Sequence, residues 1–443
     1  MPNLFPLWAQ SASQFMVRQE YKTEIITSRK GREQRRALRQ TPRKVLEYSG
    51  AMLPTLWRRI RAVLVTGQRI QWYCADPSRA MTTTAAASGA GPFSVNTVTD
   101  WAAVDVLVAL QYGTQFELRT ITAVGGADVT LTTGTFPDWP LGTSIYIALL
   151  GYLSAELQQQ TIVSDALLAK VTFEVDPISE PDDPINTLTT AWKDREVFPF
   201  QPLRLAPIQT NLKQLREVVD AGQGIIARFH PIPFTSRYFQ ATYTTTLSDF
   251  IDRIVDLHRR CKGARGEFYM PTWEHELDPI VDATAGSTSL EVEGTEIATY
   301  YVGSTIYQEI AIIRDLTYTT NGVADIEYNT VTAVNVSGSN SVLTLVNPLI
   351  GDVPAGTMVC WMPCWRFAND AVEFQYLAAR RQADRPFMST VLNLVALENF
   401  LPTTDLLLSL LGGSGGAGGG AGGGGAGGTP PSAPTILSVT DSF

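Results

Sequence analysis

The chain contains a series of β-like segments and turns: Thr120-Ile-Thr-Ala-Val124, then Val129-Thr-Leu-Thr-Thr-Gly134, then Asp138-Trp-Pro-Leu-Gly-Thr-Ser-Ile-Tyr-Ile147. The same series recurs in the same order as Thr330-Val-Thr-Ala-Val334, Val342-Leu-Thr-Leu-Val-Asn347 and Asp352-Val-Pro-Ala-Gly-Thr-Met-Val-Cys-Trp361. Runs of β-branched and aromatic residues between Gly, Pro and Asp are typical of strands joined by turns. The sequence therefore predicts that one β segment, ending in an Asp-x-Pro-x-Gly-Thr turn and a strand, occurs twice.

An upstream block of the sequence is also repeated. In the first copy, Pro42-Arg-Lys-Val45 precedes Leu56, Ile60 and Val63 at helical spacing, and Gln71-Trp-Tyr-Cys74 follows. In the second copy, Ser236-Arg-Tyr-Phe239 precedes Phe250, Ile254 and Leu257, and Glu267-Phe-Tyr-Met270 follows. Each copy thus predicts a strand, an amphipathic helix and an aromatic strand before the β-rich segment. A further helix is predicted near residues 212–219. Because the repeat is far longer than a solenoid unit, the pattern indicates domain duplication.

These repeats set the expected domain organisation. Residues 1–175 form the first repeat and residues 200–411 the second, with residues 176–199 as an acidic, Pro-rich linker between them. Residues 412–428 contain no side chain larger than Ser and predict a flexible Gly-rich linker. Residues 429–443 are either a frayed tail or a strand that docks on a neighbouring sheet edge. The expected fold class is mainly β (α+β), with two tandem β-sandwich or β-barrel domains, each with a packed helix, and a flexible C-terminal tail.

Composition excludes several classes of protein. The 443 residues are 44% hydrophobic, so the chain can bury a large core and is not globally disordered. No window of about 18 consecutive apolar residues occurs, which predicts no membrane span, and the start lacks the pattern of a secretory signal. Four Cys are too few to cross-link a chain of this length, as expected for assembly in a reducing cytoplasm.

Charge is distributed unevenly along the chain. The net charge is −9, but residues 1–80 hold 15 Lys and Arg against 5 Asp and Glu. Such a split is typical of a nucleic-acid-binding arm or of a surface that contacts an acidic neighbour. The basic residues are interleaved with apolar ones, as in Arg35-Arg-Ala-Leu38. Packing or subunit contact is therefore the favoured interpretation, and direct contact with DNA or another polyanion is the alternative.

No constellation of residues predicts catalysis. The His and Cys residues lack the spacing of a metal site; they are His230, His258, His275, Cys74, Cys261, Cys360 and Cys364. No phosphate-binding loop or nucleophile elbow occurs. Carboxylates such as Glu274, Glu276 and Asp278 are abundant, but nothing singles out a catalytic pair. We therefore expect no enzyme activity, no catalytic, metal-binding or cofactor-binding residues, and no cofactor.

Aromatic residues also recur between the copies. The recurring residues are Trp57, Trp72 and Tyr73 in the first copy and Phe268, Tyr269 and Trp273 in the second. Exposed aromatic rings could stack on sugars or bases. Their equivalent positions in the two copies instead predict that they pack in the core.

Two passages resemble a known family. The first is QEYKTEIITSRKGREQRRALR at residues 19–39, a strand followed by a polar Ser-x-x-Gly-x-Glu-x-Arg turn. The second is DRIVDLHRRCKGARGEFYMPTW at residues 252–273, a helix, a glycine turn and an aromatic strand. Both resemble the distal tail and minor tail proteins at the tail tip of long, non-contractile-tailed bacteriophages. The resemblance covers the two repeat cores; the Gly-rich linker and the last 15 residues lie outside it.

The resemblance implies a structural virion protein of the tail tip or baseplate, assembled in the host bacterial cytoplasm. Its domains would be of the tail-tube type and would form a ring that joins the hexameric tail tube to the three-fold hub. The implied partners are the tail tube protein and the tail hub or central fibre protein. The tape measure protein and side fibres are further candidate partners for the C-terminal tail. DNA would pass through the lumen without sequence-specific binding.

Symmetry extends this expectation. Because a six-fold tube needs six equivalent domains, a chain with two copies would supply them as a homotrimer with pseudo-six-fold symmetry, which we favour over a hexamer. The main alternative is a host-surface, carbohydrate-binding tail fibre or accessory protein. A tail-associated wall hydrolase and a DNA-binding role for the basic first 80 residues are further alternatives.

Overall fold

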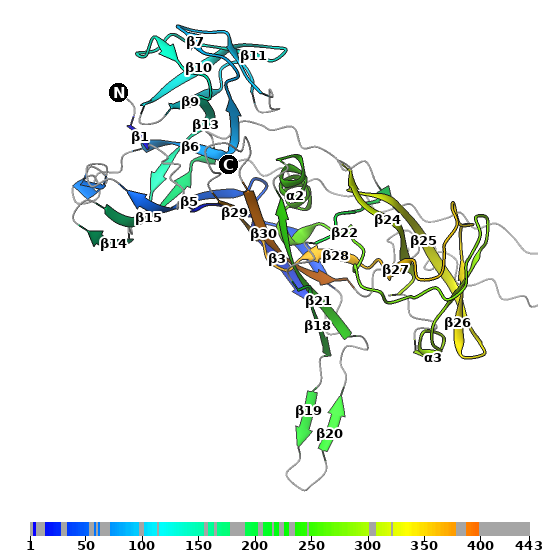
Figure 1. The fold of residues 1–443 in the computed structure, drawn as a ribbon. Helices are drawn as coiled ribbons and strands as arrows, with labels where there is room; N and C mark the ends of the chain where they lie inside the picture. The colour runs from blue at the N-terminus through cyan, green and yellow to red at the C-terminus, as the bar shows by residue number, and fades with distance from the viewer. Residues whose placement is uncertain are drawn as a thin grey trace, which may run out of the picture. The chain divides into compact units, whose positions relative to one another are not determined.

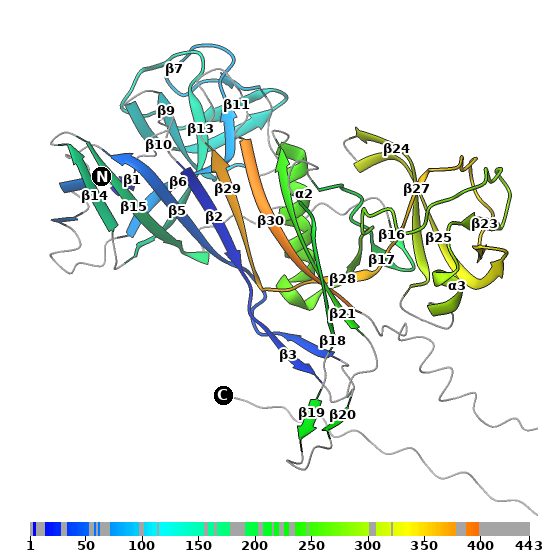
Figure 2. The same ribbon diagram turned by 60° about the horizontal axis from the view of Figure 1, so that its bottom comes forward.

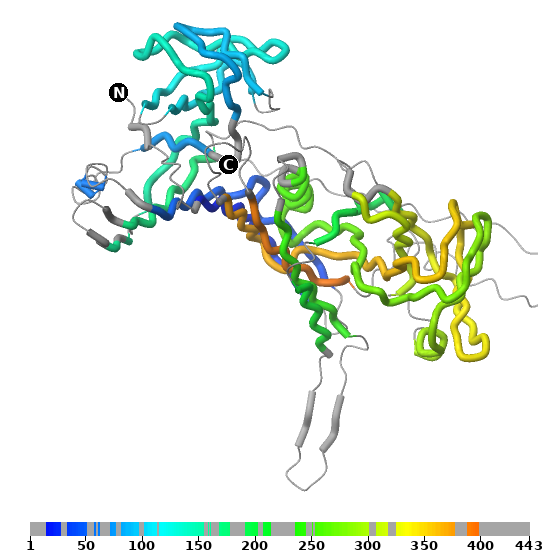
Figure 3. Tube along the Cα trace, viewed as in Figure 1, coloured from blue at the N-terminus to red at the C-terminus, as the bar shows by residue number. Residues whose placement is uncertain are grey.

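The fold is drawn in Figure 1 from a computed structural model that describes residues 3–397 with gaps. The gaps are residues 6–13, 28–32, 53–56, 59–60, 63–70, 97–101, 113–114, 155–157, 164–165, 178–190, 203–206, 215–216, 221–225, 230–234, 246–247, 301–306, 320–321 and 378–386. Figure 3 marks the uncertain positions in grey. The Gly-rich segment 412–428, the C-terminal segment 429–443 and His230 lie outside the described residues. The predictions made for the two segments are therefore untested.

The first part of the chain forms strands almost throughout. They are β1 (Asn3–Phe5), β2 (Gln14–Glu20), β3 (Thr23–Thr27), β4 (Glu33–Ala37), β5 (Arg43–Met52), β6 (Gln71–Thr82), β7 (Ala87–Ser88), β8 (Phe93–Ser94), β9 (Leu107–Tyr112), β10 (Gln115–Gly125), β11 (Asp128–Leu131), β12 (Asp138–Trp139), β13 (Ser144–Leu153), β14 (Gln158–Val163) and β15 (Ala166–Val175).

The second part adds helices to a similar set of strands. Its elements are β16 (Ala191–Trp192), β17 (Arg195–Glu196), β18 (Gln209–Gln214), β19 (Glu217–Asp220), β20 (Ile226–Phe229), β21 (Thr235–Thr245), α2 (Ser248–Cys261), the 3-10 turn η2 (Gly263–Arg265), β22 (Phe268–Tyr269), β23 (Ser289–Val292), α3 (Glu296–Tyr300), β24 (Glu309–Thr319), β25 (Gly322–Ser337), β26 (Asn340–Leu345), β27 (Met358–Trp361), β28 (Cys364–Phe367), β29 (Ala371–Leu377) and β30 (Phe387–Ala396). The predicted mainly β fold class is confirmed. We call β2–β15 the first repeat and β18–β30 the second repeat.

The strand pairings of the two repeats correspond one to one. In the first repeat, β5 pairs with β2 and β15, and β15 pairs with β14 and β13. In the second, β21 pairs with β18 and β30, and β30 pairs with β29 and β28. The β-rich segments correspond as well: β8, β11, β10, β9 and β13 pair in series, as do β23, β26, β25, β24 and β27. The chain therefore follows the same path twice.

Even an irregularity of the ladder is repeated. The β10–β11 register shifts between Ile121 and Ala123, and the β25–β26 register shifts between Val331 and Ala333. These residues align in the repeated Thr-x-Thr-Ala-Val segments. A bulge at matched positions bends both strands at the same point. β10 pairs with β9 before this point and with β11 after it, and β25 pairs with β24 before it and with β26 after it.

The Asp-x-Pro-x-Gly-Thr turns adopt one geometry in both repeats. Gly142 has φ 83° and Gly356 has φ 78°, in the left-handed region where glycine is unstrained. The following residues, Thr143 and Thr357, each donate the hydroxyl to the turn proline's carbonyl oxygen at 2.7 Å. The repeated motif therefore encodes a specific backbone turn.

Helix α2 lies where the second copy predicted a helix, and packs beside β30 and β21 (Figure 2). Ile254 and Leu257 are fully buried, as their spacing predicted. In the first copy, the named helix residues Leu56, Ile60 and Val63 lie outside the described residues, although the adjacent Trp57 and Arg58 have helical backbone.

The further helix predicted near residues 212–219 is wrong. Leu212 lies in β18 and Val219 in β19, and both elements are strands. β18 pairs with β21 from Gln209 to Gln214, and this inter-strand ladder outweighs a weak local preference for helix.

Part of the segment predicted as a linker is packed. Residues 178–190 lie outside the described residues, but β16 and β17 pair as a hairpin just after them. Val197 and Phe198 are fully buried, and Phe198 donates its backbone N–H to Tyr269 at 2.8 Å. Burial of these apolar residues joins 197–198 to the core of the second repeat.

Candidate assembly interface

The two repeats are joined edge to edge in one sheet. β2 pairs with β5 of its own repeat on one side and with β29 of the second repeat on the other. The β2–β29 ladder runs from Gln14 opposite Leu377 to Glu20 opposite Ala371. The strand order across this junction is β14-β15-β5-β2-β29-β30-β21-β18 (Figure 2). We call this run of eight strands the shared sheet.

Side chains on the shared sheet alternate between a buried and a solvent-facing side. On β2, Phe15 and Val17 are buried, whereas Met16 and Arg18 are partly exposed. On β29, Phe374 and Tyr376 are buried, whereas Glu373 and Gln375 are exposed. The period of two places the apolar residues of both repeats on the same side of the sheet. The core therefore continues across the junction.

The solvent-facing side carries charges that are paired between neighbouring strands. Lys170 of β15 lies 2.7 Å from Glu47 of β5, and Arg43 of β5 lies 2.5 Å from Glu174 of β15. At the junction, Arg18 lies 3.3 Å from Glu20 and 3.8 Å from Glu373. Exposed pairs of this kind contribute about 0–1 kcal/mol each. Their main consequence is that positive and negative charges balance along this side.

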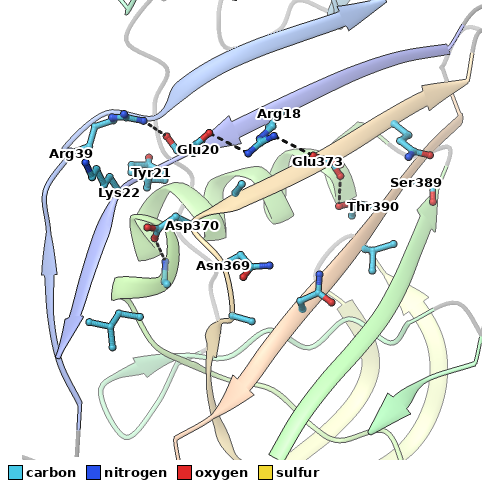
Figure 4. Close-up of a pocket in the computed structure, with 17 residues that line it drawn as sticks. Arg18, Glu20, Tyr21, Lys22, Arg39, Asn369, Asp370, Glu373, Ser389 and Thr390 are labelled. Carbon is cyan, nitrogen blue, oxygen red and sulfur yellow. Dashed lines mark hydrogen bonds and ion pairs between the residues drawn. The ribbon is translucent and has the colours of Figure 1, made fainter. Parts of the chain in front are cut away.

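A concavity of about 830 Å³ lies over the junction (Figure 4). Its labelled residues come mainly from β2, β29 and β30 and from the segments that flank them. Arg39 donates to the carbonyl oxygen of Glu20 at 3.0 Å, and Thr390 donates to the carbonyl oxygen of Glu373 at 2.8 Å. Arg39 and Thr390 are thus engaged with β2 and β29, two of the strands under the concavity.

The β3–β4 hairpin of the first repeat clamps onto the second repeat. Arg366 of β28 donates to both carboxylate oxygens of Glu33, at 2.7 and 2.8 Å. Arg35 donates to Glu267 at 3.1 Å and to the carbonyl oxygen of Arg265 at 2.9 Å. The paired side chains are largely buried, with 9% exposure for Arg366 and 18% for Glu33. Bidentate Arg–carboxylate pairs, such as Arg366 with Glu33, fix the relative orientation of the two side chains and add stability.

Asp370, just before β29, ties two segments to the junction: residues 21–23 and the turn η2. One carboxylate oxygen accepts the N–H of Ala264 at 2.9 Å, and the other accepts the N–H of Thr23. Its carbonyl oxygen accepts the N–H of Tyr21 at 3.0 Å. Gly263 has φ 72°, and a Cβ there would lie 2.6 Å from the Asp370 carboxylate, so only glycine fits this approach.

His258 of α2 completes this contact from the buried side. Its Nε2 lies 3.2 Å from the carbonyl oxygen of Asp370, which can only accept, so Nε2 carries the hydrogen. Burial lowers the pKa of His258 to about 4, despite the hydrogen bond to Asp370. Its ring packs edge-on against Tyr21 and Phe367, at centroid distances of 5.4 and 5.0 Å. The histidine is therefore neutral near pH 7 and serves to pack the junction.

The carboxylates noted in the sequence hold β21 and β18 in place. Glu274 and Glu276 lie 3.0 and 2.8 Å from the guanidinium of Arg237, whose side chain is 5% exposed. Glu274 also accepts the hydroxyl of Thr210 at 2.6 Å. Asp278 lies apart and contacts the exposed His275 at 3.2 Å.

The first repeat has a buried ion pair at the equivalent place. Lys44 of β5 lies 2.6 Å from Asp76 of β6, and both side chains are almost completely buried. On the corresponding strands β5 and β21, Lys44 directly precedes Val45, the first residue paired with β15, and Arg237 directly precedes Tyr238, the first residue paired with β30. A buried cation must have a counter-charge, because an unpaired one would cost several kcal/mol, on the order of 3–5.

The cysteines are buried and protonated. All four are free, and Cys360 of β27 and Cys364 of β28 lie in one apolar cluster. Burial raises the pKa of Cys360 to about 12 and raises that of the other three thiols as well. Among the residues that the structure describes, no group of three or more His, Cys, Asp or Glu could hold a metal ion.

The prediction that the recurring aromatics pack in the core is confirmed. Trp57, Trp72, Phe268, Tyr269 and Trp273 are buried, and Tyr73 is partly buried against the main cluster. Arg35, Arg39, Arg43 and Lys44 of the basic region contact carboxylates or backbone carbonyls, which agrees with the packing interpretation. Direct contact of this region with DNA or another polyanion stays an untested alternative.

Sequence reasoning missed the β2–β29 junction, the Glu33–Arg366 pair and Asp370. The strand pattern at residues 14–20 shows which side chains are buried, but not that a strand about 350 residues later lies beside it. The duplication is the available signal, because two like modules in one chain can pair through complementary sheet edges.

Comparisons with known proteins add no assignment. The chain matches no protein-family model, and no curated protein matches its sequence. No helix in the described part of the chain has the length and apolar character needed to span a bilayer.

Proposed function

We propose that this protein is a structural subunit of a bacteriophage tail tip, forming a ring between the hexameric tail tube and the three-fold hub. The observation that carries the proposal is the β2–β29 junction, which joins one repeat to the next edge to edge in a single sheet. A contact between different edges of like modules is heterologous, so its repetition generates either a closed ring or an open filament. A ring of such modules encloses a channel.

The number of subunits follows from the two repeats in each chain. Three chains supply six like modules, which match a six-fold tube on one side and a three-fold hub on the other. We therefore assign a homotrimer with pseudo-six-fold symmetry. Native mass measurement of the purified assembly should give three times the chain mass of 48.4 kDa. A ring of six chains would overturn this stoichiometry, and a monomer at all concentrations would overturn the ring.

The DNA channel is assigned to the solvent-facing side of the shared sheet. This side carries the paired charges of Lys170 with Glu47, Arg43 with Glu174 and Arg18 with Glu373. A balanced lining offers no positive groove to hold phosphates, because phosphate binding depends on uncompensated Lys and Arg. DNA can then pass without sequence-specific binding. The virion tail tip is the implied location, and the tube and hub proteins are the implied partners.

The alternative of a carbohydrate-binding fibre or accessory protein has less support. It was based on recurring aromatics that would lie on the surface, and Trp72 and Phe268 are instead in the core. We also propose that the protein is not an enzyme. Glu274 and Glu276, which the sequence offers as carboxylates near each other, are both bound to Arg237.

A further inference from the structure

In the described part of the chain, two edges of the shared sheet have no second neighbouring strand. Among the described residues, β18 pairs only with β21, and β14 pairs only with β15. On β18, Asn211 and Lys213 are exposed and Leu212 is 64% exposed; on β14, Gln158 and Gln160 are exposed. An uncovered edge presents backbone N–H and C=O groups to any strand that can reach them. Each edge can therefore accept a further strand.

The repeat shows what kind of partner fits. β18 lies beside β21 as β2 lies beside β5, and β14 lies beside β15 as β29 lies beside β30. β2 and β29 already pair with each other. β18 and β14 are thus the same two complementary edges, at opposite ends of the shared sheet. The strand that fits β18 is the β14 of a second copy of this chain.

The register follows from matched positions. We take the buried cations Lys44 and Arg237 as equivalent positions of the repeat. In the first repeat, Arg18 of β2 pairs with Val45, one residue after Lys44. In the second, Asn211 of β18 pairs with Tyr238, one residue after Arg237. Arg18 therefore corresponds to Asn211.

The same anchor gives the position on β14. Gln159 pairs with Ala169, which pairs with Gly50, six residues after Lys44. Phe374 pairs with Thr390, which pairs with Tyr243, six residues after Arg237. Gln159 therefore corresponds to Phe374, and its neighbours Gln158 and Gln160 correspond to Glu373 and Gln375.

We propose that β18 of one subunit pairs antiparallel with β14 of the next, with Asn211 opposite Gln158, Thr210 opposite Gln159 and Gln209 opposite Gln160. Within the chain, the matching places hold Arg18 opposite Glu373. Between chains, the amides of Asn211 and Gln158 replace that ion pair, and each amide can both donate and accept. The contact between subunits is then uncharged at its centre. The inference rests on the ring of the proposed function and names the surface that closes it.

Cysteine cross-linking of the full chain tests this register. Asn211→Cys with Gln158→Cys should form an oxidation-dependent, reducible link between chains, because paired Cα atoms across antiparallel strands lie about 4.5–5.5 Å apart. The native cysteines are buried, and each single variant should stay uncross-linked at that contact. The matched control is Lys213→Cys with Gln160→Cys, whose positions are offset by four residues, about 13 Å along the strands. The control variant should form no link between chains.

The outcomes separate this inference from the proposed function. Equal cross-linking in the control, or no cross-link in the matched pair, overturns the register. If a three-chain mass accompanies that failure, the proposed ring still stands. A matched cross-link in a six-chain assembly would keep the β18–β14 contact and overturn the three-chain stoichiometry.

Discussion

At the residue scale, His258 makes stability at the junction depend on pH. Its pKa is about 4 in the folded protein, because burial disfavours the charged form, against an ordinary value of 6.5. As pH falls below about 6.5, the unfolded chain takes up a proton that the folded chain does not, so the folded state loses stability until about pH 4. The full contribution of the neutral ring is present above about pH 6.5.

The expected loss from His258 between about pH 7 and pH 4 is about 3 kcal/mol. The measurement is the free energy of unfolding in urea at several pH values, for the natural protein and for His258→Gln. The Gln side chain can still donate to the carbonyl oxygen of Asp370 but does not titrate. Its stability should depend less on pH by that amount. Identical pH dependence in both proteins would contradict the assignment of a buried neutral histidine.

At the element scale, the β3–β4 hairpin acts as a clamp through Glu33. Glu33→Gln leaves Arg366, which is 9% exposed, with a weaker partner, and should lower the free energy of unfolding by about 1–3 kcal/mol. Glu24→Gln, at an exposed position of the same hairpin, is the matched control and should change stability by about 0.5 kcal/mol or less. Urea denaturation measures both. Equal effects of the two substitutions would show that the pair does not clamp the hairpin.

The sequence alone predicts the elements whose patterns are local, but not the contacts between distant elements. Alternating residues predicted the repeated strands, and the Asp-x-Pro-x-Gly-Thr motif predicted the turns at Gly142 and Gly356, because both patterns act over a few residues. The same local patterns misassigned Leu212, whose strand is defined by hydrogen bonds to β21. Glu33 and Arg366 could not be paired from sequence, since their contact depends on the β2–β29 junction that brings the repeats together.

At the scale of the whole molecule, one contact accounts for the arrangement of both repeats. The β2–β29 ladder uses one edge from each repeat and leaves β18 and β14 as the outer edges. A chain with two like modules and two complementary ends can extend itself through further copies of the same chain. The shared sheet would then continue from chain to chain. The C-terminal segment takes no part in this contact and would be available for contacts outside the ring.

If the protein forms the proposed ring, the C-terminal segment should be dispensable for the ring and required for attachment to another tip component. Deleting residues 412–443 is expected to leave the mass of the purified ring at three chains, less the deleted residues, while the fibre content of assembled particles falls. Deleting only residues 429–443 should have the same effect, because the glycines have no side chains with which to dock. Residues 412–428 span about 55–60 Å when fully extended. Deleting only these residues shortens the distance that residues 429–443 can reach from the ring, and should weaken attachment to a partner beyond that shortened distance. Unchanged fibre content after the full deletion would contradict the docking role, and loss of the ring would place the segment in the subunit contact itself.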